Sequence, residues 1–249
     1  QGVFVSGNYA YVACGNLSST GGLAIIDVSN PANPVLKSYL NNGTGGAELR
    51  GADSIFVSGK YAYITASGAD ALEIVDVSNP INPVHVANLY DSATTLLDQP
   101  VSVFVSGNYA YVAARTEDGL EIVDISNPVN PVHKGSISNG TGGALLDNAT
   151  SVFVSGNYAY VTSQNSNALE VVDVSDPANP VHRSAIVDGQ GGATLAYTTS
   201  VFVSGNYAYV TAYTDKALEI VDVSGATISN AQIGALKVDT LQTNNFAQF

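Results

Sequence analysis

Runs of β-branched and aromatic residues recur along this chain in one fixed order, and each run reads as a β-strand. Ser102 to Ser106 and Tyr109 to Ala114 are separated only by Gly107-Asn108, which predicts two strands joined by a tight hairpin with positive φ. Leu120 to Ser126 predicts a third strand. After an Asn- and Pro-rich turn, Val132 to Ile137 predicts a weaker fourth strand. No part of this unit reads as helix.

The same unit fills the chain in five copies. A phenylalanine marks the first strand about every 50 residues, at Phe4, Phe56, Phe104, Phe153 and Phe202. The first three strands are apolar on both faces, which suits a sheet covered on both sides, whereas the fourth carries charged residues and suits an exposed outer edge. Four antiparallel strands with this gradient predict an all-β fold, a five-bladed β-propeller with the first strands innermost around a central channel.

The repeat also predicts the domain organisation. We expect a single domain over residues 1–249, with blades at about 1–50, 51–99, 100–148, 149–197 and 198–239. Each copy begins at its first strand and ends after its fourth, so no strand exchange would close the ring. The tail, residues 240–249, is expected to fold over the closure seam with Phe246 and Phe249 as anchors, unless the chain was cut from a longer array.

The third strand carries a family resemblance. Residues 72–76 read Leu-Glu-Ile-Val-Asp, near versions follow at 120–124, 169–173 and 218–222, and residues 23–27 are a divergent copy. These segments resemble the LVIVD repeat, and the resemblance covers nearly the whole chain. It implies a β-propeller typical of bacterial and archaeal surface proteins, whose biochemical activities are mostly unassigned.

Charge and composition narrow the choice of partners. Eight basic and 21 acidic residues give a net charge of −13, which opposes binding to nucleic acid or to an anionic lipid surface. No apolar run approaches the roughly 18 residues of a transmembrane helix, so no membrane insertion is expected. The charged fraction of 12% fits an extracellular or cell-surface protein. The single Cys14 excludes an intramolecular disulfide framework.

The two ends of the predicted blades differ in variability. The hairpins between strands 1 and 2 and the turns between strands 3 and 4 are nearly identical among the copies, whereas the 2–3 loops and the inter-blade linkers vary. Specific contacts should use the variable end, because binding residues tend to lie on variable loops of a rigid scaffold. We therefore predict ligand-binding residues there, with Tyr side chains for stacking and two linker acids: Tyr90, Tyr197, Tyr213, Asp98 and Asp147.

Several recurring polar residues are better explained by structure than by chemistry. An aspartate ends the third strand in each copy and is expected to accept hydrogen bonds in the following turn, at Asp27, Asp76, Asp124, Asp173 and Asp222. A glutamate recurs on the third strand of four copies but is replaced by Ala24 in the first, so it is not indispensable. His85, His133 and His182 share one outer-strand position on successive blades, too far apart for a common zinc ion. We expect no metal site and no cofactor.

Four Asn-x-Ser/Thr sequons stand on the variable loops, at Asn16, Asn42, Asn139 and Asn148. They would suit a secreted, N-glycosylated protein, although a chain rich in Asn, Ser and Thr also forms such sequons by chance.

These observations favour a non-catalytic, extracellular or cell-surface binding or adhesion module whose partner is a glycan or a protein. The first alternative is a structural subunit of a surface layer or extracellular fibre, for which self-assembly would follow. The second is a propeller glycosidase, which would need a pair of carboxylates from the set Asp53, Asp98 and Asp147.

Overall fold

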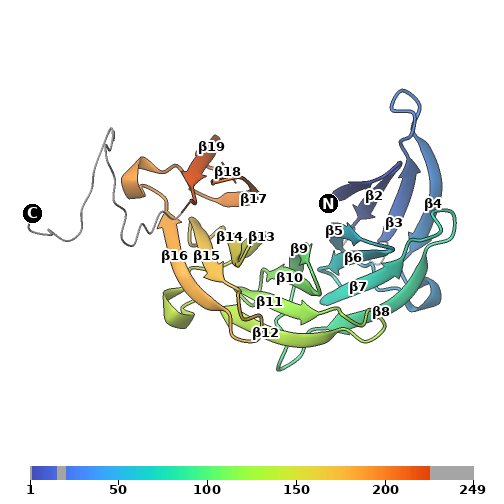
Figure 1. The fold of residues 1–249 in the computed structure, drawn as a ribbon, viewed down its shortest axis with the longest axis horizontal. Helices are drawn as coiled ribbons and strands as arrows, with labels where there is room; N and C mark the ends of the chain where they lie inside the picture. Colours follow the sequence, from blue (N-terminus) through green and yellow to red (C-terminus); the bar gives the residue numbers. More distant parts are fainter. Residues whose placement is uncertain (1, 16–20, 225–249) are drawn as a thin grey trace, which may run out of the picture.

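The computed structural model describes residues 2–15 and 21–224 and confirms the all-β, five-bladed propeller. Five antiparallel sheets follow one another along the chain; four have four strands, and the last has three within the described residues. Strand order in every sheet is the order in the sequence, so no strand is exchanged between these sheets. Figure 1 shows the sheets, here called blades 1 to 5, arranged side by side along an arc.

The strands have the following bounds. Blade 1 contains β1 (Val3–Ser6), β2 (Tyr9–Cys14), β3 (Gly22–Asp27) and β4 (Val35–Asn41). Blade 2 contains β5 (Ala52–Ser58), β6 (Tyr61–Ala66), β7 (Ala71–Asp76) and β8 (Val84–Tyr90). Blade 3 contains β9 (Pro100–Ser106), β10 (Tyr109–Ala114), β11 (Gly119–Asp124) and β12 (Val132–Ser138). Blade 4 contains β13 (Ala149–Ser155), β14 (Tyr158–Ser163), β15 (Ala168–Asp173) and β16 (Val181–Val187). Blade 5 contains β17 (Thr198–Ser204), β18 (Tyr207–Ala212) and β19 (Ala217–Asp222). Three single-turn 3₁₀ segments lie in the linkers, η1 (Thr44–Gly46), η2 (Thr141–Gly143) and η3 (Gln190–Gly192).

The hairpin between the first two strands has the predicted geometry. The glycine at its first central position has φ between 56° and 59° in all five blades, at Gly7, Gly59, Gly107, Gly156 and Gly205. The residue after it does not have positive φ, so the turn is of the type that needs glycine only at its first central position. Lys60 can therefore replace asparagine in blade 2 without strain.

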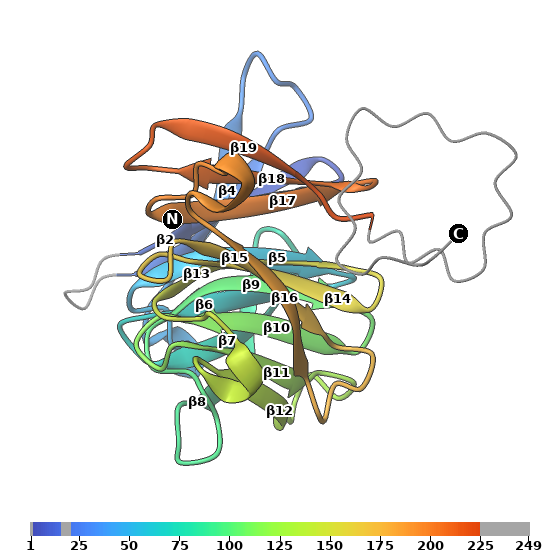
Figure 2. The same cartoon turned by 90° about the vertical axis from the view of Figure 1, so that its left-hand side faces the viewer.

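Backbone hydrogen bonds sort the connections onto two opposite ends of the blades. The first hairpin and the turn after strand 3 meet at one end, where the Ile125 N–H donates to the Asn108 carbonyl at 2.9 Å. The 2–3 loop meets the incoming linker at the other end, where the Arg115 N–H donates to the Gln99 carbonyl at 3.0 Å. We call the second end the linker face. Figure 2 gives the side view, with the successive sheets stacked along the arc.

Each blade packs on the next through two different apolar faces. Between blades 2 and 3, the face of blade 2 contributes Tyr63, Leu72 and Ile74, and the face of blade 3 contributes Leu97, Val103, Val105, Ala110, Val112, Val123 and Ile125. The inner strands touch in the order β1, β5, β9, β13 and β17. Their phenylalanine rings form one continuous row with centroids 4.6 to 5.2 Å apart, which is favourable aromatic packing.

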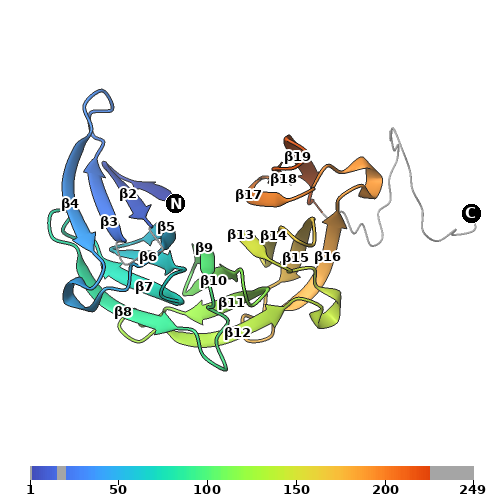
Figure 3. The ribbon, with the colours of Figure 1, turned by 180° about the vertical axis from the view of Figure 1, so that it is seen from behind.

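The first and last blades do not cover one another. Figure 3 shows open space between β1–β4 and β17–β19. Val3 and Val5 are 63% and 61% exposed, whereas Val103 and Val105 at the same repeat positions are 5% and 6% exposed. The expected seam-closing tail, residues 240–249 with Phe246 and Phe249, lies outside the described residues.

No helix within residues 2–15 and 21–224 has the length and apolar character needed to cross a membrane.

Candidate functional site

The linkers on the linker face are held by side-chain oxygens that accept from consecutive backbone N–H groups. In the linker from blade 2 to blade 3, the Leu96 N–H donates to Glu121 Oε2 at 3.1 Å and the Leu97 N–H donates to Asp91 Oδ1 at 3.0 Å. The Asp98 N–H points to Glu117 Oε2 at 3.5 Å, and the Gln99 N–H donates to Asp70 Oδ1 at 3.0 Å. Side chains from both blades thus satisfy a loop that has no strand partner.

The other linkers use the same positions with fewer acids. In the linker from blade 3 to blade 4, two of the four acceptors are neutral. The Leu146 N–H donates to Asn139 Oδ1, and the Asp147 N–H donates to Ser166 Oγ. In the linker from blade 4 to blade 5, the Tyr197 N–H donates to the neutral Asn167 Oδ1. Among the described linkers, the one between blades 2 and 3 alone has carboxylates at all four acceptor positions, and Asp98 adds a fifth acid beside them.

This concentration of acids changes the chemistry of two carboxyl groups. Glu117 is partly buried, and burial raises its pKa to about 7, with a further rise from the negative charge of Asp91. The pKa of Asp98 is also raised, by burial and by the charges of Asp70 and Asp91. A carboxyl group with a pKa near 7 can both accept and donate a proton at neutral pH. We call Asp91, Asp98 and Glu117 the acidic cluster.

Glu117 holds its linker through a longer contact than the equivalent loop residues. Its 3.5 Å contact with the Asp98 N–H compares with 3.2 Å for Ser166 Oγ and 2.9 Å for Asp215 Oδ2 at the equivalent places. Its carboxyl group also interacts with the side chain of Asp91.

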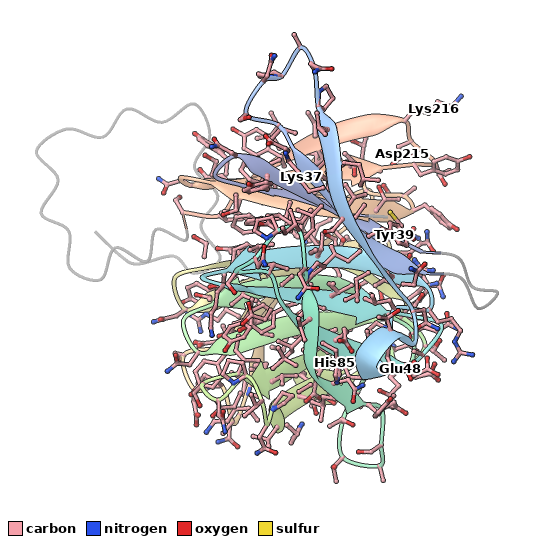
Figure 4. All side chains as sticks on the ribbon, turned by 90° about the vertical axis from the view of Figure 1, so that its right-hand side faces the viewer. Lys37, Tyr39, Glu48, His85, Asp215 and Lys216 are labelled. Carbon is pink, nitrogen blue, oxygen red and sulfur yellow. The ribbon has the colours of Figure 1, made fainter. Side chains whose placement is uncertain are left out.

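A buried glutamate and a histidine form a second repeated arrangement. Glu73, Glu121 and Glu170 are fully buried, and each lies 2.5 to 2.6 Å from the Nδ1 atom of its own blade's His85, His133 or His182. The other carboxylate oxygen of Glu73 accepts from the Glu48 N–H at 3.0 Å. Figure 4 shows the side chains of Glu48 and His85 next to one another beside this linker. The glutamates are linker anchors, a role that the sequence analysis did not predict, and each histidine bonds the glutamate of its own blade.

The predicted ligand-binding residues do not form one site. Asp98 belongs to the acidic cluster, whereas Asp147 lies in the next linker, where its Oδ1 accepts from Asn165 Nδ2 at 2.8 Å. Tyr90 is exposed at the end of β8 in blade 2. Tyr197 and Tyr213 lie together at the last linker, with ring centroids 5.8 Å apart.

Tyr197 has an unusual backbone. Its φ is 62°, in the left-handed region that an aromatic residue rarely adopts. The equivalent linker positions hold Gly51, Gln99 and Asn148, which also have positive φ. The ring remains 42% exposed, so burial of the side chain does not explain the choice of tyrosine here.

Other predicted residues have structural roles. The aspartates at the end of strand 3 accept from the backbone N–H two residues later at 2.8 to 3.0 Å in every blade, which confirms the predicted turn role. Among the sequons, the Oδ1 atoms of Asn42 and Asn139 accept from linker N–H groups, and Asn148 is partly buried with φ 57°. Asn16 lies outside the described residues. Glycosylation stays a prediction.

A cavity of about 410 Å³ lies between strands β14 to β16 of blade 4 and the end of β19. It is bounded by Ser224, the last residue described. Between blades 1 and 2, the equivalent position is covered by the turn after strand 3 of blade 2. There Ser38 Oγ of blade 1 donates to the Pro80 carbonyl at 2.7 Å. In blade 5 the corresponding residues follow Ser224 and lie outside the described residues.

From the sequence, Asp98 was predicted as a site residue, but Asp91 and Glu117 were not. A signal was present, because blade 3 carries Glu117 where blade 4 has Ser166, and the linker before blade 3 begins at Asp91 where the one before blade 4 begins at Asn139. Their convergence depends on a linker folding against a loop 19 residues away, which a repeat comparison does not reveal.

Comparison with known proteins gives the family and the fold. A family model for the LVIVD repeat matches residues 1–42, 50–91, 100–139, 147–186 and 196–230. No curated protein gave a significant match. The similar solved structures include a periplasmic gluconolactonase from Pseudomonas aeruginosa, with a TM-score of 0.71 and 14% identity over 89% of this chain and 65% of that one. A putative 6-phosphogluconolactonase from Bacteroides uniformis has a TM-score of 0.71 and 13% identity over 91% of this chain and 68% of that one. A protein of unknown function from Desulfotomaculum acetoxidans has a TM-score of 0.69 and 14% identity over 90% of this chain and 68% of that one. This chain spans about two thirds of the length of these structures.

These comparisons correct the functional expectation. The sequence favoured a non-catalytic binding or adhesion module, with a structural subunit or a glycosidase as alternatives, whereas the similar propellers with a named activity include lactonases. The expectation relied on the variable loops and their tyrosines, which suit binding but carry no information about catalysis. One fold can carry many functions, so the function has to be argued from the residues of the site.

Proposed function

Because the chain belongs to the LVIVD repeat family and shares its fold with lactonase propellers, we propose that it hydrolyses a lactone, with the acidic cluster as the catalytic centre. The observation that carries the proposal is the Glu117 carboxyl group, partly buried between Asp91 and Asp98 on the linker face. No other loop residue of the described blades combines this position with a pKa raised to about 7.

Glu117 would act as general base and then as general acid. In the ionised form it takes a proton from water as the water oxygen attacks the lactone carbonyl. The tetrahedral intermediate then collapses, the ring carbon–oxygen bond breaks, and the proton on Glu117 passes to the departing ring oxygen. The product is the open hydroxy acid, and Glu117 returns to its starting state. Burial, together with the negative charges of Asp91 and Asp98, sets the pKa of Glu117 close to neutral pH.

The charge of the site selects among lactones. Four carboxylates face the linker between blades 2 and 3, and the whole chain has a net charge of −13. A phosphorylated lactone would be repelled, so the proposed substrate is an uncharged lactone of a sugar acid. Once opened, the product carries a carboxylate, and the same repulsion favours its release. An extracellular or cell-surface location remains a prediction that would be compatible with this substrate.

The test is hydrolysis of an uncharged aldonolactone followed in a pH-stat, with spontaneous hydrolysis subtracted. We expect Glu117→Gln to lower kcat/KM by about 100-fold or more. Asp215→Asn is the matched control, because Asp215 holds the equivalent linker N–H in blade 5 at 2.9 Å and should leave the rate unchanged.

The pH profile adds an independent readout, since wild-type kcat/KM should rise with pH through the pKa of Glu117 near 7. Hydrolysis no faster than the spontaneous rate, or equal rates for wild type and Glu117→Gln, would refute the proposal.

A further inference from the structure

The arc ends in two uncovered apolar faces of complementary kind. Each inner interface joins a face rich in Tyr and Leu to a face rich in Val and Ala, as between blades 2 and 3. Blade 5 exposes the first kind, because Leu218 and Ile220 are 60% and 53% exposed, whereas Leu72 and Ile74 at the same repeat positions are fully buried. Blade 1 exposes the second kind through Val3 and Val5.

The serine and the backbone N–H group that bond across the inner interfaces also recur at the two ends of the arc. Ser54 Oγ accepts from the Val103 N–H at 3.3 Å, and the same bond recurs in the next two interfaces at 3.1 and 3.3 Å. At the ends of the arc, Ser200 is the equivalent serine and is exposed, and the Val3 N–H is at the equivalent position on blade 1. The two ends therefore match in hydrogen bonding as well as in apolar surface.

Blade 1 differs from the others at the positions that hold an incoming linker. In blades 2 to 5 a glutamate accepts an N–H from the linker that arrives from the preceding blade. Blade 1 has Ala24 at the glutamate position and Leu36 at the histidine position. A linker arriving there would leave an N–H without its carboxylate, at a cost in stability. Blade 1 therefore lacks the carboxylate acceptor that the linkers use in blades 2 to 5, and a second copy packed on this face would not need it.

From these three observations we infer that this chain associates head to tail with a second copy of itself, the blade 5 face of one copy packing on the blade 1 face of the next. The contact reproduces the inner blade–blade interface, with Leu218 and Ile220 against Val3 and Val5 and with Ser200 Oγ accepting from the Val3 N–H. The interface is heterologous, so each copy has one donor face and one acceptor face. The inference is independent of the proposed lactone hydrolysis.

Two single variants each block one face. Val5→Asp places a charge on the blade 1 face, and Leu218→Asp places one on the blade 5 face. Either should weaken self-association by about 10- to 100-fold, since a charge replaces an apolar contact. Val129→Asp is the matched control, because Val129 is 63% exposed but lies in the turn before β12 of blade 3, away from both faces. Circular dichroism and thermal melting establish that each variant is folded.

Sedimentation velocity on the whole chain at rising concentration is the measurement. We expect wild type and Val129→Asp to form larger species, and each face variant alone to remain monomeric. A mixture of Val5→Asp and Leu218→Asp should form a 1:1 dimer, because each variant has the intact face that the other lacks.

A wild-type monomer at all concentrations would overturn the inference and would show that these faces do not bind a second copy of the chain. Oligomers unaffected by Val5→Asp would also overturn it and would indicate a symmetric contact between blade 5 faces.

Discussion

The Nδ1 atom of His133 lies 2.6 Å from Oε1 of Glu121, whose side chain is fully buried, and the other carboxylate oxygen accepts from the Leu96 N–H at 3.1 Å. One carboxyl group thus ties the outer strand of blade 3 to the linker that enters the blade. Because a buried carboxylate is costly, its protonation state is linked to the stability of the whole arc.

This arrangement predicts that stability falls as pH rises from about 4.5 to 7. Burial raises the pKa of Glu121 from 4.5 to about 7, despite the hydrogen bonds from Leu96 and His133. Between these values the folded state binds more protons than the unfolded state, so the contribution is fully present below 4.5 and is lost through 7. Burial raises the pKa of Glu73 and Glu170 in the same direction.

Glu121→Gln tests this dependence, because the amide keeps an acceptor for Leu96 and stays neutral. The free energy of unfolding is measured in urea at pH 5 and pH 8. Between these pH values the wild type should lose on the order of 1–3 kcal/mol more of it than the variant does. An equal pH dependence in wild type and variant would show that the buried carboxyl does not titrate in this range.

The open arc predicts unequal costs for one substitution at two equivalent repeat positions. Leu120 is fully buried at the interface between blades 3 and 4, whereas Leu218 is largely exposed. Leu120→Ala should lower the free energy of unfolding by about 2–5 kcal/mol, because it removes contacts and leaves a cavity. Leu218→Ala should cost about 0.5 kcal/mol or less at low protein concentration. Chemical denaturation compares them, and similar losses would indicate that blade 5 is covered.

The hairpin repeated in every blade predicts strain from backbone conformation alone. Gly107 has φ 58°, and a Cβ atom added there would meet nothing within 4 Å. Gly107→Val should therefore cost about 1 kcal/mol or more through its φ, without a clash. Asn108→Lys, which copies Lys60 of blade 2, should be neutral in the same denaturation assay. If Gly107→Val impaired lactone hydrolysis while leaving stability unchanged, the turn would have a functional role instead.

The strained Tyr197 predicts a stabilising substitution. Asparagine tolerates positive φ better than tyrosine and already stands at the equivalent position 148. Tyr197→Asn should raise the free energy of unfolding by about 0.5–1 kcal/mol, reduced by whatever the contact with Tyr213 contributes. Thermal denaturation measures this, with Tyr213→Ala as the control that removes the ring contact but keeps the strain. A loss of stability with Tyr197→Asn would mean that the ring contact outweighs the backbone cost.

The repeated sequence determined the fold to a large extent. Strands, hairpin glycines and turn aspartates follow from interactions within a few residues, such as Asp124 Oδ1 with the Ser126 N–H two residues later. Such interactions depend on local residue type and spacing, so five copies predict them five times. The assignment of the linkers and 2–3 loops to one face followed in the same way from strand alternation.

Only the tertiary structure decided how the polar groups of distant segments meet. Glu117 reaches a linker residue 19 positions away, and Ser54 bonds a strand 49 positions away. Tyr197 and Tyr213 lie together because the Tyr213 N–H donates to the Tyr197 carbonyl at 3.0 Å, whereas Tyr90 lies at the end of β8 in blade 2. The sequence determined what each blade is, since a blade is built from local pairing. The structure decided which faces and carboxylates meet, since those contacts depend on the packing of whole blades.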